Sequence, residues 1–144
     1  MYRVYDTQKK RWLKYDIYLM PNGDLYKLEK PIFRKRNTLK QLSNERYIVH
    51  RDIGLTDKNG ILMYEGDICE AMINEDETIN AEIAYVDHIA SYVLLDYKTG
   101  RYYSLGTEQA NLIEVVGNVL DTPELLEFEE EVSDDKQPLQ ESEI

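Results

Sequence analysis

Residues 54–70 read GLTDKNGILMYEGDICE and hold two sharp turn signals on either side of a short apolar run. In the first turn, DKNG at 57–60, the Asn-Gly pair accepts the positive φ of a tight hairpin. The run 61–64 has the length and composition of a strand buried on both faces. In the second turn, EGD at 65–67, Gly66 is free to adopt positive φ and Asp67 can accept a nearby backbone N–H. We therefore expect this stretch to form a hairpin turn, a strand and a corner.

The same turn chemistry recurs on both sides of this stretch. Upstream, PNGD at 21–24 separates an alternating apolar segment from a returning one and predicts a β-hairpin. Between this hairpin and a short strand at 47–49, Leu39 and Leu42 stand at helical spacing and allow one helical turn. Downstream, five short strands are predicted, at 68–73, 79–85, 92–97, 101–105 and 112–116. Closely spaced short strands favour a small closed barrel of SH3-like type, with a half-open sandwich as the alternative.

The predicted organisation is mainly β and has four parts. Residues 1–51 form a basic N-terminal strand and hairpin region, and residues 52–120 form the small barrel with the DKNG and EGDI motifs. A helix is expected over 121–132, because Thr122 can cap it and Pro123 suits its first position. Residues 133–144 are a polar, acidic tail that we expect to be mobile.

Composition indicates a folded protein of a reducing compartment. Of 144 residues, 42% are hydrophobic, which is enough for a packed core. Tyrosine dominates the aromatics, with 12 Tyr against 2 Phe and 1 Trp, and it suits half-buried strands and interfaces. Neither a membrane-spanning apolar run nor a signal peptide is recognisable, and Cys69 is the single cysteine, so we expect a cytoplasmic protein.

Charge is distributed unevenly along the chain. Residues 1–51 carry 13 Lys/Arg and 5 Asp/Glu, a net of +8, whereas 52–120 carry a net of −10 and 121–144 a net of −9. A basic block beside acidic ones either steers subunits together or marks a nucleic-acid footprint. The candidate nucleic-acid contacts are the aromatic and basic residues of the first block: Trp12, Lys14, Lys27, Arg34, Lys35 and Arg36. The net charge of −11 repels phosphate at long range and disfavours this alternative.

Signals for catalysis or metal binding are weak. Cys69 follows Ile68 in an expected strand and is interpreted as a core residue. His50 and His88 have no second ligand at metal-ligand spacing. Glu65, Asp67 and Glu70 could gather around a hard cation, but the spacing of a calcium loop is missing. We expect no enzymatic activity, no cofactor and no metal.

Two motifs resemble those of a known family. The chain resembles the YopX family of phage and prophage proteins in two segments, GLTDKNGILMYEGDI at 54–68 and EVVGNVLDTPELL at 114–126. In that family a segment D-x-N-G … (Y/F)-E-G-D-I precedes a late segment (V/I)-G-N-(I/V)-x-(D/E)-x-P-E-L-L. The opening YRVYD resembles the start of that family, so the resemblance covers residue 2 to about residue 126. It departs at residues 61–63, where the family more often has a charged residue, and in the acidic extension after residue 126.

The resemblance implies a small, mainly β protein without an assigned activity, and it brings no catalytic or ligand residues. The motif residues are therefore interpreted as turn and backbone determinants: Asp57, Asn59, Gly60, Tyr64, Glu65, Gly66, Asp67, Gly117, Asn118 and Pro123. The expected role is that of a phage-encoded interaction or assembly module, self-associating or binding a phage or host protein in the host cytoplasm. Nucleic-acid binding through the N-terminal region is the alternative, and no membrane association is expected.

Overall fold

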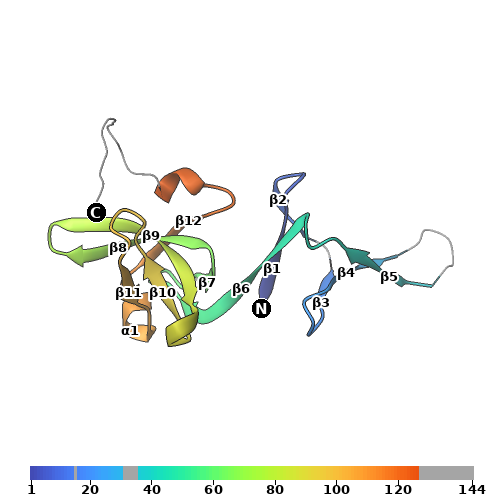
Figure 1. The fold of residues 1–144 in the computed structure, drawn as a ribbon, viewed down its shortest axis with the longest axis horizontal. Helices are drawn as coiled ribbons and strands as arrows, with labels where there is room; N and C mark the ends of the chain where they lie inside the picture. Colours follow the sequence, from blue (N-terminus) through green and yellow to red (C-terminus); the bar gives the residue numbers. More distant parts are fainter. Residues whose placement is uncertain (15, 31–35, 127–144) are drawn as a thin grey trace.

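The computed structural model describes residues 1–14, 16–30 and 36–126 and confirms a mainly β protein (Figure 1). A four-stranded sheet with the order β2-β1-β6-β7 joins its two ends. Its strands are β1 (Tyr2–Asp6), β2 (Arg11–Trp12), β6 (Tyr47–Thr56) and β7 (Leu62–Tyr64). The first half of β6 pairs with β1 and its second half pairs with β7. This ten-residue strand continues without interruption across the expected boundary between residues 51 and 52.

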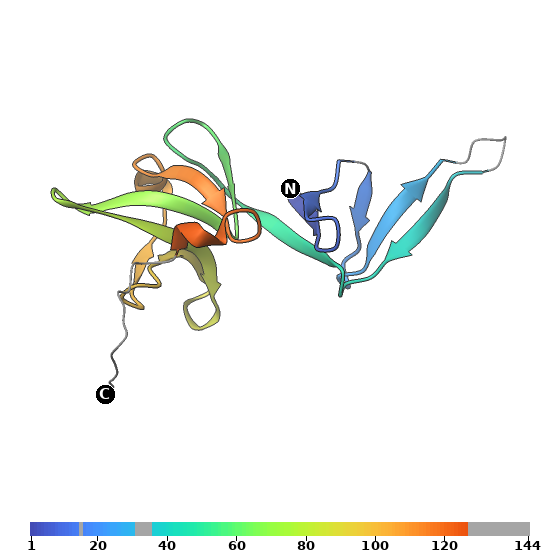
Figure 2. The same cartoon turned by 90° about the horizontal axis from the view of Figure 1, so that it is seen from above.

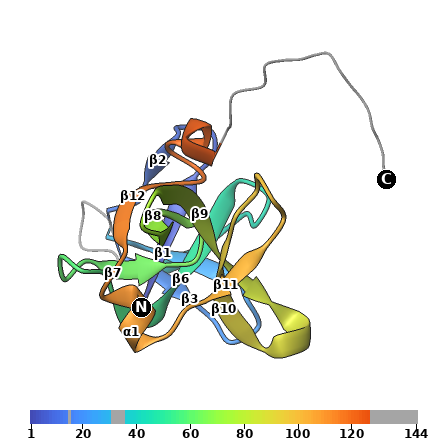
Figure 3. The ribbon, with the colours of Figure 1, turned by 90° about the vertical axis from the view of Figure 1, so that its left-hand side faces the viewer.

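A five-stranded antiparallel sheet with the order β11-β10-β9-β8-β12 curls into a half-barrel. It consists of β8 (Asp67–Asn74), β9 (Glu77–Val86), β10 (Ser91–Leu95), β11 (Tyr102–Ser104) and β12 (Glu114–Asn118). Small residues face each other between β8 and β9, since Cys69 pairs with Ala81 and both are fully buried. Figure 3, which faces the half-barrel, shows its strands curling around a common interior.

The half-barrel core is completed by short helical segments. Met63, Ile83 and Leu94 pack with Ala110 and Ile113, so the helix α1 (Thr107–Ala110) and the residues after it close the interior. A 3₁₀ turn, η1 (Asp87–Ile89), joins β9 to β10. A second 3₁₀ turn, η2 (Pro123–Leu126), packs near β9, where the Asn80 side chain donates to the Leu125 carbonyl at 3.0 Å. None of the helices in the described part of the chain is long and apolar enough to cross a membrane.

A three-stranded sheet, here called the arm, projects from the opposite end of the molecule (Figures 1 and 2). It has the order β3-β4-β5, with β3 (Ile17–Leu19), β4 (Leu25–Glu29) and β5 (Thr38–Leu42). Its base packs on β1 through a second small core of Val4, Leu25 and Leu42. The hairpin predicted at 21–24 is confirmed between β3 and β4, with Gly23 at φ +94°.

Several local expectations are wrong. Leu39 and Leu42 lie in the strand β5 and not in a helical turn; a spacing of three puts them on opposite faces, with Leu42 buried and Leu39 exposed. The run 61–64 is not buried on both faces, because β7 is an edge strand on which Met63 alone is fully buried. The last strand starts at Glu114, two residues after its predicted start at residue 112, because Ile113 packs into the core before the strand begins.

The C-terminal segment contains a different type of helix from the one expected. The described residues after Asp121 form the 3₁₀ turn η2 and not an α-helix up to residue 126. The remainder of the expected helix, residues 127–132, and the whole acidic tail lie outside the described residues.

Candidate functional site

Asp57 fixes the first motif turn through its carboxylate. It is buried, and its Oδ1 accepts the backbone N–H groups of Asn59 and Ile61, each at 2.9 Å. Its Oδ2 accepts the N–H of Val115 at 2.9 Å, which ties the turn to β12. Burial raises the pKa of Asp57, but these three donors outweigh it and hold the pKa below its ordinary value. The turn closes through Gly60 at φ +79°.

The second motif turn places a carboxylate against the N-terminal strand. Asp67 is buried at the start of β8; its Oδ2 accepts the Tyr64 N–H at 2.8 Å, and its Oδ1 accepts Nη2 of Arg3 in an ion pair at 2.5 Å. Burial raises the pKa of Asp67, and these two donors offset that shift only in part. The EGD corner therefore connects the half-barrel to β1 across 64 residues of sequence.

Aromatic rings enclose the Arg3 guanidinium. Its central carbon lies 4.3 Å from the ring centroid of Trp12 and 4.5 Å from that of Tyr64, and both contacts are cation–π interactions. Trp12 Nε1 donates to Asp121 Oδ2 at 2.8 Å. We call the group of Arg3, Trp12, His50, Tyr64 and Asp67 the junction.

His50 is the packed member of the junction. It is 8% exposed, and its ring lies 5.7 Å from that of Trp12 and directly against the backbone of Gly66. Burial, with a smaller effect from the charge of Arg3, lowers the pKa of His50 to about 4. A Cβ on Gly66 would lie 2.4 Å from His50 Cε1, so glycine is required there for space as well as for its φ of +85°.

The late motif shapes the chain as it leaves β12. Asn118 is buried, and its Oδ1 accepts the N–H groups of Leu120 and Asp121 at 3.0 and 2.8 Å. Gly117 makes room for the turn, because a Cβ there would lie 2.1 Å from Oγ1 of Thr122. Pro123 is the first residue of η2. Each of these residues acts on the local backbone.

The arm presents an apolar outer face. The register aligns Tyr18 with Tyr26 and Leu28 with Leu39, which puts the four side chains on the face opposite Leu25 and Leu42. Tyr18 is 42% exposed and Leu39 is 52% exposed. No element among residues 1–14, 16–30 and 36–126 forms a second layer on this face (Figure 2).

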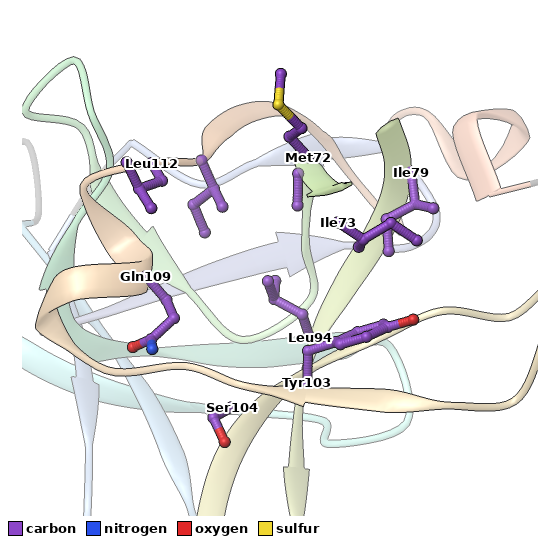
Figure 4. Close-up of a pocket in the computed structure, with 10 residues that line it drawn as sticks. Met72, Ile73, Ile79, Leu94, Tyr103, Ser104, Gln109 and Leu112 are labelled. Carbon is purple, nitrogen blue, oxygen red and sulfur yellow. The ribbon is translucent and has the colours of Figure 1, made fainter. Parts of the chain in front are cut away.

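An apolar cavity of about 230 Å³ opens at the side of the half-barrel (Figure 4). Leu94, Ala71 and Ile113 are buried at its floor. Met72 and Leu112 stand at its mouth, 67% and 75% exposed. Tyr103, Ser104 and Gln109 also line it, and they are its polar groups.

The YopX family model matches residues 1–127. The chain belongs to the YopX family. Its fold is similar to the crystal structure of protein yopX from Bacillus subtilis, with a TM-score of 0.59 and 20% identity over 88% of this chain and 97% of the other. It is also similar to protein EF1440 from Enterococcus faecalis, with a TM-score of 0.53 and 23% identity over 88% of this chain and 96% of the other. None of the curated proteins matches the chain. YopX membership assigns it no activity.

Of the candidate nucleic-acid contacts that the structure of this YopX protein describes, Trp12 and Lys14 line one cavity beside Asp121, whereas Lys27 is in β4 and Arg36 precedes β5. Trp12 lies in the junction, with its ring nitrogen already bonded to Asp121. Lys14 is exposed after β2, and Lys27 is half-buried on the face of the arm that also carries Leu25. Arg36 is exposed; Arg34 and Lys35 lie outside the described residues.

The residues considered for chemistry are separated. Cys69 is fully buried, and burial raises the pKa of its thiol to about 12. His50 is in the junction, whereas His88 is exposed in η1. In the parts of the chain that the structure describes, no group of three or more His, Cys, Asp or Glu side chains is arranged to hold a metal ion.

Sequence reasoning missed the junction, the cavity and the third strand of the arm with its exposed outer face. Arg3 and Asp6 are charged residues in a short apolar strand, a pattern that indicates buried or half-buried ion pairs. Each finds a partner far along the chain: Asp6 is buried and accepts two bonds from Arg46, Nε to Oδ1 at 2.9 Å and Nη2 to Oδ2 at 2.8 Å. The Arg46 hydrogen bonds hold the pKa of Asp6 far below its ordinary value. The pairing of β5 with β4 in the arm and the cavity of the half-barrel depend on strand pairing that no local pattern reveals.

Proposed function

We propose that this chain is a non-enzymatic, phage-encoded interaction module that self-associates in the cytoplasm of the host cell. The observation that carries the proposal is the uncovered outer face of the arm. An antiparallel sheet can keep one face in water, but that face is then normally polar, and an exposed apolar patch marks a contact surface. Another copy of the chain can cover this face.

Two further features support self-association. Both β3 and β5 are edge strands, and four of the five residues of β5 are exposed, so backbone groups at the edge are accessible to another chain. The net charge of +8 on residues 1–51 and −10 on residues 52–120 attracts the N-terminal part of one copy to the half-barrel of another.

Light scattering coupled to size-exclusion chromatography tests this proposal on the full chain at low and high salt. We expect assemblies at low salt that dissociate as salt rises, because the attraction is partly electrostatic. A matched pair of variants locates the contact: Leu39→Ser on the arm should weaken assembly, whereas Ile61→Ser, an equally exposed apolar residue away from the arm, should not. A monomer at both salts, unchanged when residues 127–144 are deleted, would refute the proposal.

Nucleic-acid binding remains the second candidate function. The observation that favours it is the pair Tyr18 and Tyr26 side by side on the outer face of the arm, where bases could stack. Binding to labelled single- and double-stranded DNA across a salt series tests this function. A steep fall of affinity with salt supports it, and no binding at low salt eliminates it.

A further inference from the structure

We propose that the apolar cavity of the half-barrel accepts the arm of a second copy, so that copies join head to tail. The inference rests on the proposed self-association and names the surface that receives the arm. Leu39 is the residue that we expect to enter the cavity, because it is the most exposed large apolar side chain among the described residues of the arm.

The cavity has the size and lining for such a side chain. Its volume of about 230 Å³ exceeds that of one leucine side chain, and buried Leu94, Ala71 and Ile113 offer only carbon atoms at its floor. Filling the cavity would also cover Leu112, the most exposed of the large apolar residues that line it.

Charge favours the arm as the guest. None of the elements that line the cavity, β8, β9, β10, β11 and α1, contains a Lys or Arg. Exposed acids adjoin the lining residues in the sequence: Glu75 and Asp76 in the turn between β8 and β9, Glu77 at the start of β9, and Glu108 in α1. Exposed basic residues lie near Leu39 in the arm: Lys40 follows it in β5, Arg36 precedes β5, and Lys30 follows β4. A basic arm with an exposed apolar side chain complements these acids.

The geometry requires the arm to come from another molecule. In Figures 1 and 2 the arm and the half-barrel lie at opposite ends, with the four-stranded sheet between them. The arm of a chain therefore cannot reach its own cavity. A contact between two different surfaces is heterologous, and it builds a closed ring or an open chain of copies.

Two variants of exposed residues test the inference on the full chain: Leu39→Glu on the arm and Leu112→Glu at the mouth of the cavity. Because both side chains are exposed, each variant should fold, which circular dichroism and thermal unfolding verify. Light scattering should show that each variant alone self-associates about tenfold more weakly or worse, the loss expected when one leucine is no longer buried. Ile61→Glu, an exposed apolar residue outside both surfaces, should assemble as the wild type does.

Mixing the two variants gives the decisive result. The Leu39→Glu chain keeps an intact cavity and the Leu112→Glu chain keeps an intact arm, so the mixture should form a one-to-one dimer and nothing larger. If Leu112→Glu assembles normally while Leu39→Glu does not, the arms pair with each other; the cavity inference is then overturned and the proposed self-association stands. A wild type that stays monomeric overturns both.

Discussion

Replacing Gly66 by alanine should destabilise the fold through two separable effects. Gly66 has φ +85°, a region that costs an L-residue about 1–2 kcal/mol. A Cβ would also lie 2.4 Å from Cε1 and 2.9 Å from Nδ1 of His50, and such overpacking typically costs about 1–3 kcal/mol. The backbone cannot move away easily, because the Gly66 N–H donates to Ile83 and its carbonyl accepts from Val119, each at 2.9 Å.

We therefore expect the free energy of unfolding to fall by about 3 kcal/mol in Gly66→Ala, a large share of the 5–15 kcal/mol typical of a domain. Gly60→Ala is the matched control: its φ is +79°, but nothing lies within 4 Å of the added Cβ, so only the backbone cost of about 1 kcal/mol remains. Urea unfolding followed by circular dichroism and by the fluorescence of Trp12, which lies in the junction, measures both values.

A double-mutant cycle with His50→Ala isolates the steric part. If the imidazole is what the new methyl group meets, the added cost of Gly66→Ala should shrink to that of the Gly60 control once the ring is removed. The reasoning is refuted if Gly66→Ala costs no more than Gly60→Ala, or if removing the His50 ring leaves the difference unchanged.

Three further predictions follow from the buried polar groups. The pKa of His50 falls from 6.5 to about 4 on folding, so the neutral ring is favoured and stability should be lost as pH drops below 6.5, by about 2 kcal/mol near pH 5. Between pH 6.5 and pH 5 the urea midpoint should change less with pH in His50→Gln than in the wild type. An equal change with pH in both proteins would show that His50 is not the group responsible. Asp57→Ala leaves three backbone N–H groups without their acceptor and should lower the free energy of unfolding by about 3 kcal/mol or more. Glu65→Gln is the control: it keeps an oxygen for its single bond to a backbone N–H and should change stability by less than about 0.5 kcal/mol. Similar urea midpoints for the two variants would show that the Asp57 carboxylate is not needed. Cys69 should resist a thiol reagent in the native state at pH 8 and react once urea unfolds the chain, because burial raises its pKa to about 12; rapid native labelling would contradict this.

Local chemistry was enough to predict the turns and most of the strands, but not which distant strands pair. The sequence predicts the Asn-Gly turns at 22–23 and 59–60, because few other residue pairs tolerate the positive φ of a tight turn. Both glycines have positive φ in the structure. The alternation over 79–85 likewise identifies β9, since a strand with one buried face must alternate. In contrast, the spacing of Leu39 and Leu42 wrongly indicates a helical turn, because two residues three apart share one face of a helix but lie on opposite faces of a strand.

The candidate surfaces were less predictable than the fold. The junction joins Arg3 to Asp67 and Trp12 to Asp121, pairs that are 64 and 109 residues apart. These contacts arise because β1 pairs with β6, which brings distant parts of the chain together. The residues next to Arg3 or Trp12 in the sequence do not indicate them. The negative charge of the half-barrel is visible in the sequence as the net charge of residues 52–120, but the sequence does not show that the basic arm lies at the opposite end of the molecule.

The shared strand β6 has a consequence for how the molecule comes apart. Residues Tyr47–Arg51 complete the ladder with β1, and Asp52 and Thr56 pair with β7, so one continuous strand belongs to both ends of the chain. Fraying of either ladder exposes backbone groups on the same strand, and this weakens the other ladder. The two ends should therefore melt in a single cooperative transition, although the basic and acidic halves of the sequence suggest two independent units.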